Sequence, residues 1–67
     1  MKYYILKIQS LHVHPTVWRV NGHEVTRLRS NKWDTSMYQS DFVKINEDFQ
    51  EVTKEQVKQW YPKAEVL

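Results

Sequence analysis

The feature that most constrains this chain is an Asn-Gly pair in the middle of the stretch VWRVNGHEVTRLR, residues 17–29. Residues that favour β-strands flank the pair on both sides, and Gly22 is the single glycine of the chain. Both central residues of a type I′ turn need a positive φ, which Asn and Gly adopt readily. The stretch therefore predicts a β-hairpin with Asn21 and Gly22 at its tip, in a register where Arg19 faces Glu24.

The hairpin register sorts the side chains into two faces, because successive residues of a strand point to opposite sides. One face carries more apolar bulk, so we expect it to pack on the core: Trp18, Val20, His23, Val25, Arg27 and Arg29. The other face is more polar: Val17, Arg19, Glu24, Thr26 and Leu28.

The N-terminal segment YYILKIQSLHV, residues 3–13, alternates apolar and polar side chains in two registers. A β-bulge near Gln9 and Ser10 would bring both sets to one face. Alternatively, the two sets stay on opposite faces and the strand is buried on both sides. Pro15 then ends or bends the strand. The apolar run is too short and interrupted for a signal peptide or a membrane span. We therefore expect a soluble, cytoplasmic protein without a membrane partner.

The segment VTKEQVKQWYP, residues 52–62, has the signals of a short helix. Thr53 and Gln56 are spaced as a capping box, and Pro62 is a helix stop. The large apolar residues at i, i+3 and i+4 share one face: Val57, Trp60 and Tyr61. The pattern predicts a helix over about residues 54–61.

Between the hairpin and this helix the signals are weaker. Residues 30–41 are polar and turn-like, with Trp33 and Tyr38 as anchors. The stretch FVKI, residues 42–45, is typical of a short strand, and FQEV, residues 49–52, is a candidate to pair back. The terminal AEVL is a further candidate strand.

This order of elements predicts one domain over residues 1–67, in the α+β class. We expect a small curved antiparallel sheet of three to five strands, containing the Asn21-Gly22 hairpin, packed with one C-terminal helix. A small SH3-like or OB-like barrel with an added helix is the alternative. The chain has no cysteine, so its core must hold the fold without disulfides or cysteine-bound metal.

The net charge of +2 hides an uneven distribution of charge. Six of the ten Lys and Arg residues lie in residues 1–33, whereas seven of the eight Asp and Glu residues lie in residues 34–67. A basic half indicates a polyanionic partner, unless the two halves neutralise each other in the fold.

Within the basic half, cations and aromatic residues occur close together. Arginines beside aromatic residues on a sheet are typical of proteins that bind single-stranded nucleic acid. The hairpin register also brings Trp18 within reach of a cation–π contact with Arg27. We predict nucleic-acid or nucleoprotein binding, with Trp33 stacking on bases and three cations on phosphates: Arg27, Arg29 and Lys32.

Other chemistry finds less support in the residues. His12 and His14 share one side of an extended strand, but the hairpin tip with His23 is roughly 20 Å away. A shared zinc ion needs bonds of about 2 Å, and the spacing predicts no carboxylate that would complete a site. The chain also lacks a glycine-rich phosphate loop and a nucleophile motif. We expect a non-enzymatic protein without metal or cofactor.

The alternative function is a protein-interaction module, such as a small accessory or inhibitor protein. An exposed Trp33 or Tyr38 would suit a protein-binding hot spot. The small size and the Lys-, Asn- and Tyr-rich composition suit a phage or mobile-element gene. A homodimer through an exposed edge strand is compatible with either function.

Overall fold

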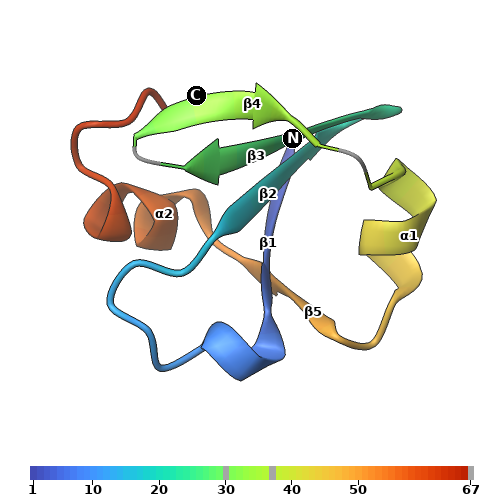
Figure 1. Cartoon of the computed structure of the whole chain (residues 1–67), viewed down its shortest axis with the longest axis horizontal. Coiled ribbons are helices and arrows are strands. Elements are labelled where there is room, and N and C mark those ends of the chain that lie inside the picture. The colour runs from blue at the N-terminus through green and yellow to red at the C-terminus, as the bar shows by residue number, and fades with distance from the viewer. Residues whose placement is uncertain (30, 37, 67) are drawn as a thin grey trace.

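The computed structural model describes residues 1–29, 31–36 and 38–66. Within these residues, five strands form one antiparallel sheet in the order β4-β3-β2-β1-β5 (Figure 1). The strands are β1 (Lys2–Leu6), β2 (Val17–Asn21), β3 (Glu24–Arg29), β4 (Lys32–Thr35) and β5 (Phe49–Val52). The predicted α+β class is confirmed, and the sheet is open, so the barrel alternative is wrong.

Two helices cover the sheet, one on each side. Helix α1 (Ser40–Ile45) follows β4 and helix α2 (Lys54–Trp60) follows β5, at opposite ends of the view in Figure 1. Each helix contributes its buried valine to a different hydrophobic cluster, Val43 from α1 and Val57 from α2. The single C-terminal helix of the sequence prediction is therefore present, but a second helix accompanies it.

The first face of the sheet is the side that packs against α2. All five strands contribute to this face, and the segment after α2 closes over it with Ala64 and Val66. Burying each such large apolar side chain stabilises the fold by roughly 1.5–3 kcal/mol. The buried residues of this cluster are Tyr3, Ile5, Val17, Leu28, Val52 and Val57, with Trp33, Trp60 and Tyr61 partly buried against them.

The second face is the side that packs against α1. Its cluster is more aromatic, and the rings of Trp18 and Phe49 meet edge to face at 5.2 Å. Such tilted pairs are favoured by the ring quadrupoles and add about 0.5–1.5 kcal/mol to simple burial. The buried residues are Tyr4, Trp18, Val20, Val25, Val43 and Phe49, and none of them comes from β4.

The predicted hairpin of β2 and β3 is confirmed, but its turn is shifted by one residue. Asn21 is the last residue of β2 and pairs with Glu24, so the turn consists of Gly22 and His23. Gly22 has a φ of 64°, and the only other positive φ among the described residues is at Asn31. A positive φ at the first central residue alone is typical of a type II′ turn, which replaces the predicted type I′ turn.

The shifted turn changes which residues face each other across the hairpin. Val20 now pairs with Val25 instead of His23, which brings two β-branched side chains together in the core. Arg19 pairs with Thr26, so the predicted pairing of Arg19 with Glu24 is wrong. A turn shifted by one residue displaces the pairing register of the two strands by two residues. Because this displacement is even, every side chain keeps its predicted face.

Both faces of the hairpin are buried, whereas the sequence indicated only the one with Trp18. The opposite face supplies Val17 and Leu28, each with no exposed surface, to the first cluster. A helix on each side of the sheet explains this difference, because neither face is left to solvent over the central strands.

The stretch predicted as a strand at residues 42–45 is helical in the structure and belongs to α1. Val43 points into the second cluster, whereas Phe42 and Ile45 stay exposed. Asp41 in the first turn and Lys44 in the last turn suit the helix dipole. Burial of Val43 over the sheet therefore outweighs the β-propensity of this stretch.

Of the two alternatives for the N-terminal strand, the β-bulge near Gln9 is wrong, and burial on both sides is confirmed for β1, where Tyr4 is buried on one face and Tyr3 and Ile5 on the other. Strand β1 ends at Leu6, and residues Lys7–Gln9 form a 3-10 turn, η1. The Lys7 amide still bonds to the Asp48 carbonyl at 2.8 Å, which extends the contact with the segment before β5. The rest of the connection to β2 runs over the surface and leaves Leu11 exposed.

The C-terminal elements follow the sequence prediction closely at α2 and depart from it afterwards. The capping box is present, with the Thr53 hydroxyl accepting from the Gln56 amide and the Gln56 side chain accepting from the Thr53 amide. The predicted strand at residues 64–67 is absent over 64–66, where Ala64 and Val66 instead pack on the first face. Residue 67 lies outside the described part.

Candidate nucleic-acid interface

The four residues predicted to bind nucleic acid lie on β3 and β4, but on different faces of the sheet. Arg29 pairs directly with Lys32, whereas Trp33 pairs with the core residue Leu28. Paired residues of antiparallel strands share a face, and neighbours along a strand alternate. Arg27, Arg29 and Lys32 therefore share the second face, and Trp33 lies on the first.

Trp33 is engaged in packing and hydrogen bonding on the first face. Its ring centroid lies 6.3 Å from that of Tyr3, and the Arg19 guanidinium sits 4.1 Å above its ring. Its indole Nε1 donates to the Glu65 carbonyl at 2.6 Å. These contacts attach the C-terminal segment to β4, and they place Trp33 away from the three cations.

The three cations of the second face are not neutralised by nearby carboxylates. Asp34 lies directly opposite Arg27 in the sheet, yet the two side chains form no ion pair. Among the described residues, the one salt bridge joins Lys2 and Glu51 at 3.9 Å, with both side chains mostly exposed. In the described residues one exposed pair therefore joins the basic and acidic halves, and it involves none of the three cations Arg27, Arg29 and Lys32.

An exposed aromatic pair lies on the same face as these cations. Tyr38 and Phe42 are stacked, with ring centroids 4.9 Å apart and ring planes 25° apart, and they are 37% and 45% exposed. Tyr38 also packs at 5.8 Å on Trp18, the residue that faces Arg27 across β2 and β3. The buried Trp18 indole therefore lies between the aromatic pair and Arg27.

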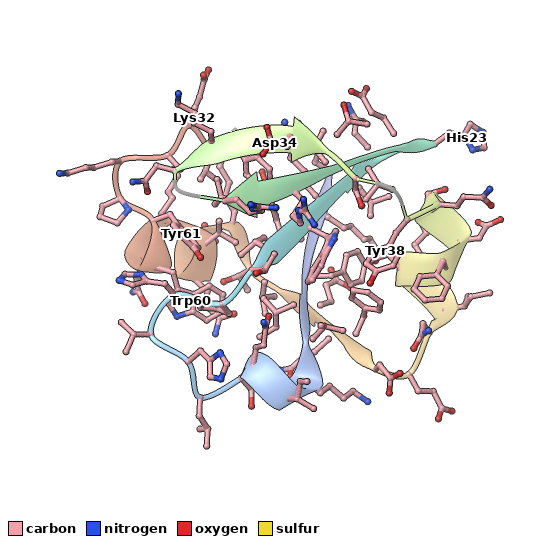
Figure 2. The ribbon with its side chains drawn as sticks, in the orientation of Figure 1. His23, Lys32, Asp34, Tyr38, Trp60 and Tyr61 are labelled. Atoms are coloured by element: carbon pink, nitrogen blue, oxygen red, sulfur yellow. The ribbon has the colours of Figure 1, made fainter. Side chains whose placement is uncertain are left out.

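The five residues Arg27, Arg29, Lys32, Tyr38 and Phe42 are referred to below as the cation–aromatic face. In Figure 2, Lys32 and Tyr38 lie toward opposite ends of the sheet, with β3 and β4 running between them. The sequence did not predict Phe42 as a surface residue, because FVKI, residues 42–45, is typical of a strand with Phe42 in the core. Tyr38 directly precedes the N-cap of α1 and Phe42 lies in its first turn, so their contact depends on a helix that the sequence did not predict.

Two buried donors near the centre of this face lack hydrogen-bond acceptors among the described residues. They are the Trp18 indole Nε1 and the Arg27 Nε, from residues that are directly opposed in β2 and β3. A buried donor without a partner costs roughly 1–3 kcal/mol.

A pocket of about 470 Å³ borders the Tyr38 end of the face, between the hairpin tip and the start of α1. Its lining includes Tyr38 and His23 together with two carboxylates, Glu24 and Asp41. The two carboxylates repel phosphate groups from the pocket itself, so the attraction for phosphates is strongest at the other end of the face, at Arg29 and Lys32.

A second pocket, of about 550 Å³, lies at the other end of the sheet, beside the turn between β3 and β4. Figure 2 shows Trp60 and Tyr61 at this end, the end where Lys32 begins β4. The pocket has aromatic walls and no acidic lining residue: His14, Asn31, Trp60, Tyr61, Pro62 and Lys63. We refer to it as the turn pocket.

Hydrogen bonds from two side chains hold the wall of the turn pocket. The Tyr61 hydroxyl donates to the Pro15 carbonyl at 2.6 Å, and burial raises the pKa of the Tyr61 phenol above its usual 10.0. The His14 Nδ1 lies 2.9 Å from the Trp60 carbonyl, and the His14 ring packs on Tyr61 at 5.6 Å. A carbonyl only accepts, so Nδ1 carries the hydrogen and Nε2 of the neutral ring is an acceptor.

The three histidines are separated in the structure. His14 belongs to the turn pocket, His23 is at the hairpin tip, and His12 is exposed in the connection between η1 and β2. Within the described part of the chain, no three His, Asp or Glu side chains are grouped closely enough to hold a metal ion.

No family model matches this chain, and neither a curated protein nor a solved structure shows a significant similarity to it. Over the described residues, no helix is both long and apolar enough to cross a membrane.

Proposed function

We propose that the protein binds single-stranded nucleic acid on the cation–aromatic face. One observation carries the proposal: three cations without ion-pair partners among the described residues share a face with an exposed, stacked Tyr38–Phe42 pair. Single strands are bound by this combination, because cations follow the phosphates while bases stack on aromatic rings.

The two ends of the face contribute differently to binding. Arg29 and Lys32 are exposed and directly paired, so their charges add at one place and attract phosphates from a distance. Arg27 is half-buried and faces Asp34, which reduces its net field. We expect Arg29 and Lys32 to supply most of the electrostatic attraction, and Arg27 to make a shorter contact near the centre.

The aromatic pair favours single strands over duplexes. In a duplex the base faces are covered by their neighbours, whereas an unpaired strand offers them to Tyr38 and Phe42. Stacking contributes about 1–3 kcal/mol per base in such proteins.

The test is a titration with fluorescently labelled single- and double-stranded oligonucleotides at about 50 and 200 mM salt. We expect tighter binding of the single strand and a steep loss of affinity at the higher salt. The double variant Arg29→Ala/Lys32→Ala should lower the slope of log affinity against log salt by about 1.4, since each single-strand phosphate contact contributes about 0.7.

The matched control is Lys54→Ala/Lys58→Ala, which removes two lysines from α2 and leaves the net charge equal to that of the test variant. For stacking, Phe42→Ala is compared with Ile45→Ala, an exposed apolar residue of the same helix. No binding at the lower salt, or equal losses in test and control variants, would overturn the proposal.

Protein interaction is the second candidate function, and a separate observation favours it. The connection between β1 and β2 exposes three large apolar side chains, Ile8 at 85%, Leu11 at 95% and Val13 at 74%. Exposed apolar groups that gather on one segment are typical of protein contacts. Sedimentation of wild type and Leu11→Lys tests whether this segment mediates self-association. A wild type that is monomeric at every accessible concentration would exclude a homodimer through it.

A further inference from the structure

We infer that the turn pocket is a second subsite that receives one unpaired base, so that a bound strand continues from the cation–aromatic face around the end of the sheet. The inference rests on the proposed function and extends it, because it assigns a base-binding role to residues on the opposite side of the β3–β4 turn. It also predicts that the protein distinguishes a strand with bases from an abasic strand at this position.

The walls of the turn pocket suit a planar aromatic ligand. Trp60 and Tyr61 line the pocket and are half-buried, and the His14 ring contacts both the Trp60 carbonyl and the Tyr61 ring. The volume of about 550 Å³ lies within the range of about 300–1,000 Å³ that is usual for small-ligand sites. Base stacking on such rings depends little on sequence, because every base has a π face.

The polar groups of the pocket match the edge of a base and its phosphate. His14 presents Nε2 as an acceptor, and the Asn31 side chain offers both a donor and an acceptor. Lys63 is exposed at the pocket and adds a cation for the phosphate. Asn31 adopts a positive φ of 65°, a conformation that Asn tolerates better than most residues, and this places its side chain at the tip of the turn.

Continuity with the cation–aromatic face identifies the ligand as part of the same strand. Asn31 directly precedes Lys32, and Lys32 pairs with Arg29 across the turn. Cations therefore lie on both sides of the turn, Arg29 and Lys32 on one side and Lys63 on the other. A bound strand that continues from the second face beyond Lys32 would next reach the aromatic side chains that line the turn pocket.

The pocket at the opposite end of the sheet provides an internal contrast. It has a similar volume, about 470 Å³, and also contains a histidine and a tyrosine, but Glu24 and Asp41 line it. A phosphate-bearing ligand is repelled there and attracted at the turn pocket, where Lys63 is the charged residue. This difference makes His23 a matched control for His14.

The experiment measures binding of a labelled single strand to His14→Ala and Lys63→Ala, with His23→Ala and Lys58→Ala as controls. We expect each pocket variant to weaken binding by about five- to tenfold, the lower part of the range for one stacked base, and each control by less than twofold. Circular dichroism checks that each variant is folded, and Lys63→Ala changes only an exposed side chain.

A second measurement uses small probes and side-chain NMR signals of the wild-type protein. Adenosine monophosphate should shift the signals of His14, Trp60 and Tyr61, and adenosine should shift them more than inorganic phosphate does. Equal effects of adenosine monophosphate and inorganic phosphate would identify a phosphate site only and would overturn the inference.

The two proposals fail in distinguishable ways. If the oligonucleotide binds and Arg29→Ala/Lys32→Ala weakens it, but the pocket variants match their controls, then the turn pocket inference is wrong and the proposed function stands. If no oligonucleotide binds at the lower salt, both are wrong. Weakening by the pocket variants together with shifts caused by adenosine supports both.

Discussion

The two faces of this sheet are closed in different ways. The first face is covered from edge to edge, because α2 and residues 61–66 pack over side chains from all five strands. The second face is covered by α1 and its neighbouring aromatic residues, and the second cluster contains no residue of β4. The first face thus has core residues on all five strands, whereas the second has core residues on β1, β2, β3 and β5 and is surface at β4.

The polar contacts follow the same division. On the first face, side chains bond to backbone carbonyls of distant segments, as in Trp33 to Glu65 and Tyr61 to Pro15. On the second face, Arg27 has an unsatisfied Nε, and Arg29 and Lys32 have no ion-pair partner among the described residues. Burying a charge without a partner is costly, so cations collect where the covering helix ends. Both faces contribute buried clusters to the fold, and the second also leaves exposed cations at β4, where we propose that nucleic acid binds.

The largest expected effect comes from Leu28→Ala, which opens a cavity in the first face. Leu28 has no exposed surface, so truncation should lower the free energy of unfolding by about 2–5 kcal/mol. Arg29→Ala, the next residue of β3 and exposed on the second face, should change it by about 0.5 kcal/mol or less. Urea denaturation measures both. Similar losses in the two variants would contradict the division of roles between the faces.

A smaller loss of stability is expected from Thr53→Ala. This change removes the side chain that caps α2, the helix that covers the first face, and should cost about 1 kcal/mol. Thr35→Ala, at an exposed position of β4, serves as the control and should be nearly neutral. Thermal denaturation followed at the helical signal measures the difference. An unchanged melting temperature in Thr53→Ala would mean that the capping box contributes little to closing this face.

Because the Tyr61 phenol is partly buried, we expect the stability of the fold to decrease at alkaline pH. Burial raises the pKa of its phenol above 10.0, so the folded state holds the proton more tightly than the unfolded state. This stabilisation is complete below pH 10.0 and is lost as the pH rises through the folded-state pKa. Tyr61→Phe should remove this part of the alkaline loss. It should also cost about 0.5–1.5 kcal/mol at neutral pH through the missing bond to Pro15.

Urea titrations of both proteins at neutral pH and near pH 10.5 test this prediction. Wild type should lose more stability than Tyr61→Phe between the two conditions. A loss of equal size in both proteins would assign the alkaline sensitivity to other groups.

The smallest expected effect is that of Trp33→Phe on binding. Trp33 was predicted from the sequence to stack on bases, but it lies on the first face under the C-terminal segment. We expect Trp33→Phe to leave oligonucleotide affinity within twofold of wild type while it weakens protection of the C-terminal amides against hydrogen exchange. A loss of affinity as large as that of Arg29→Ala/Lys32→Ala would return Trp33 to the binding site.

Local signals in the sequence correctly predicted the hairpin and the C-terminal helix. The turn needs a residue that accepts positive φ, and the chain has a single glycine. The capping box of Thr53 and Gln56 involves residues three apart, so its geometry depends only on the helix itself. Both elements are specified by interactions between near neighbours in the chain, and these can be read from composition and spacing.

The candidate site was predicted less completely. Arg27, Arg29 and Lys32 are brought together as expected, but whether they bind nucleic acid stays a prediction. The placement of Trp33 depends on how β4 pairs with β3, and residues 30–41 were interpreted as a polar loop. The exposure of Phe42 depends on α1, a helix of six residues whose β-forming side chains favour a strand when taken alone.

The sequence by itself thus determined the elements that short-range chemistry specifies, namely the β2–β3 hairpin, helix α2 and the alternation of side chains along β3. The tertiary structure decided which helix and which segments cover each face of the sheet. It turned residues 42–45 into a helix over Val43, placed Trp33 beneath the C-terminal segment and formed the turn pocket from residues far apart in the chain. Long-range packing outweighs local preference there, because burial of a few large side chains stabilises the fold more than the propensity of a short segment does.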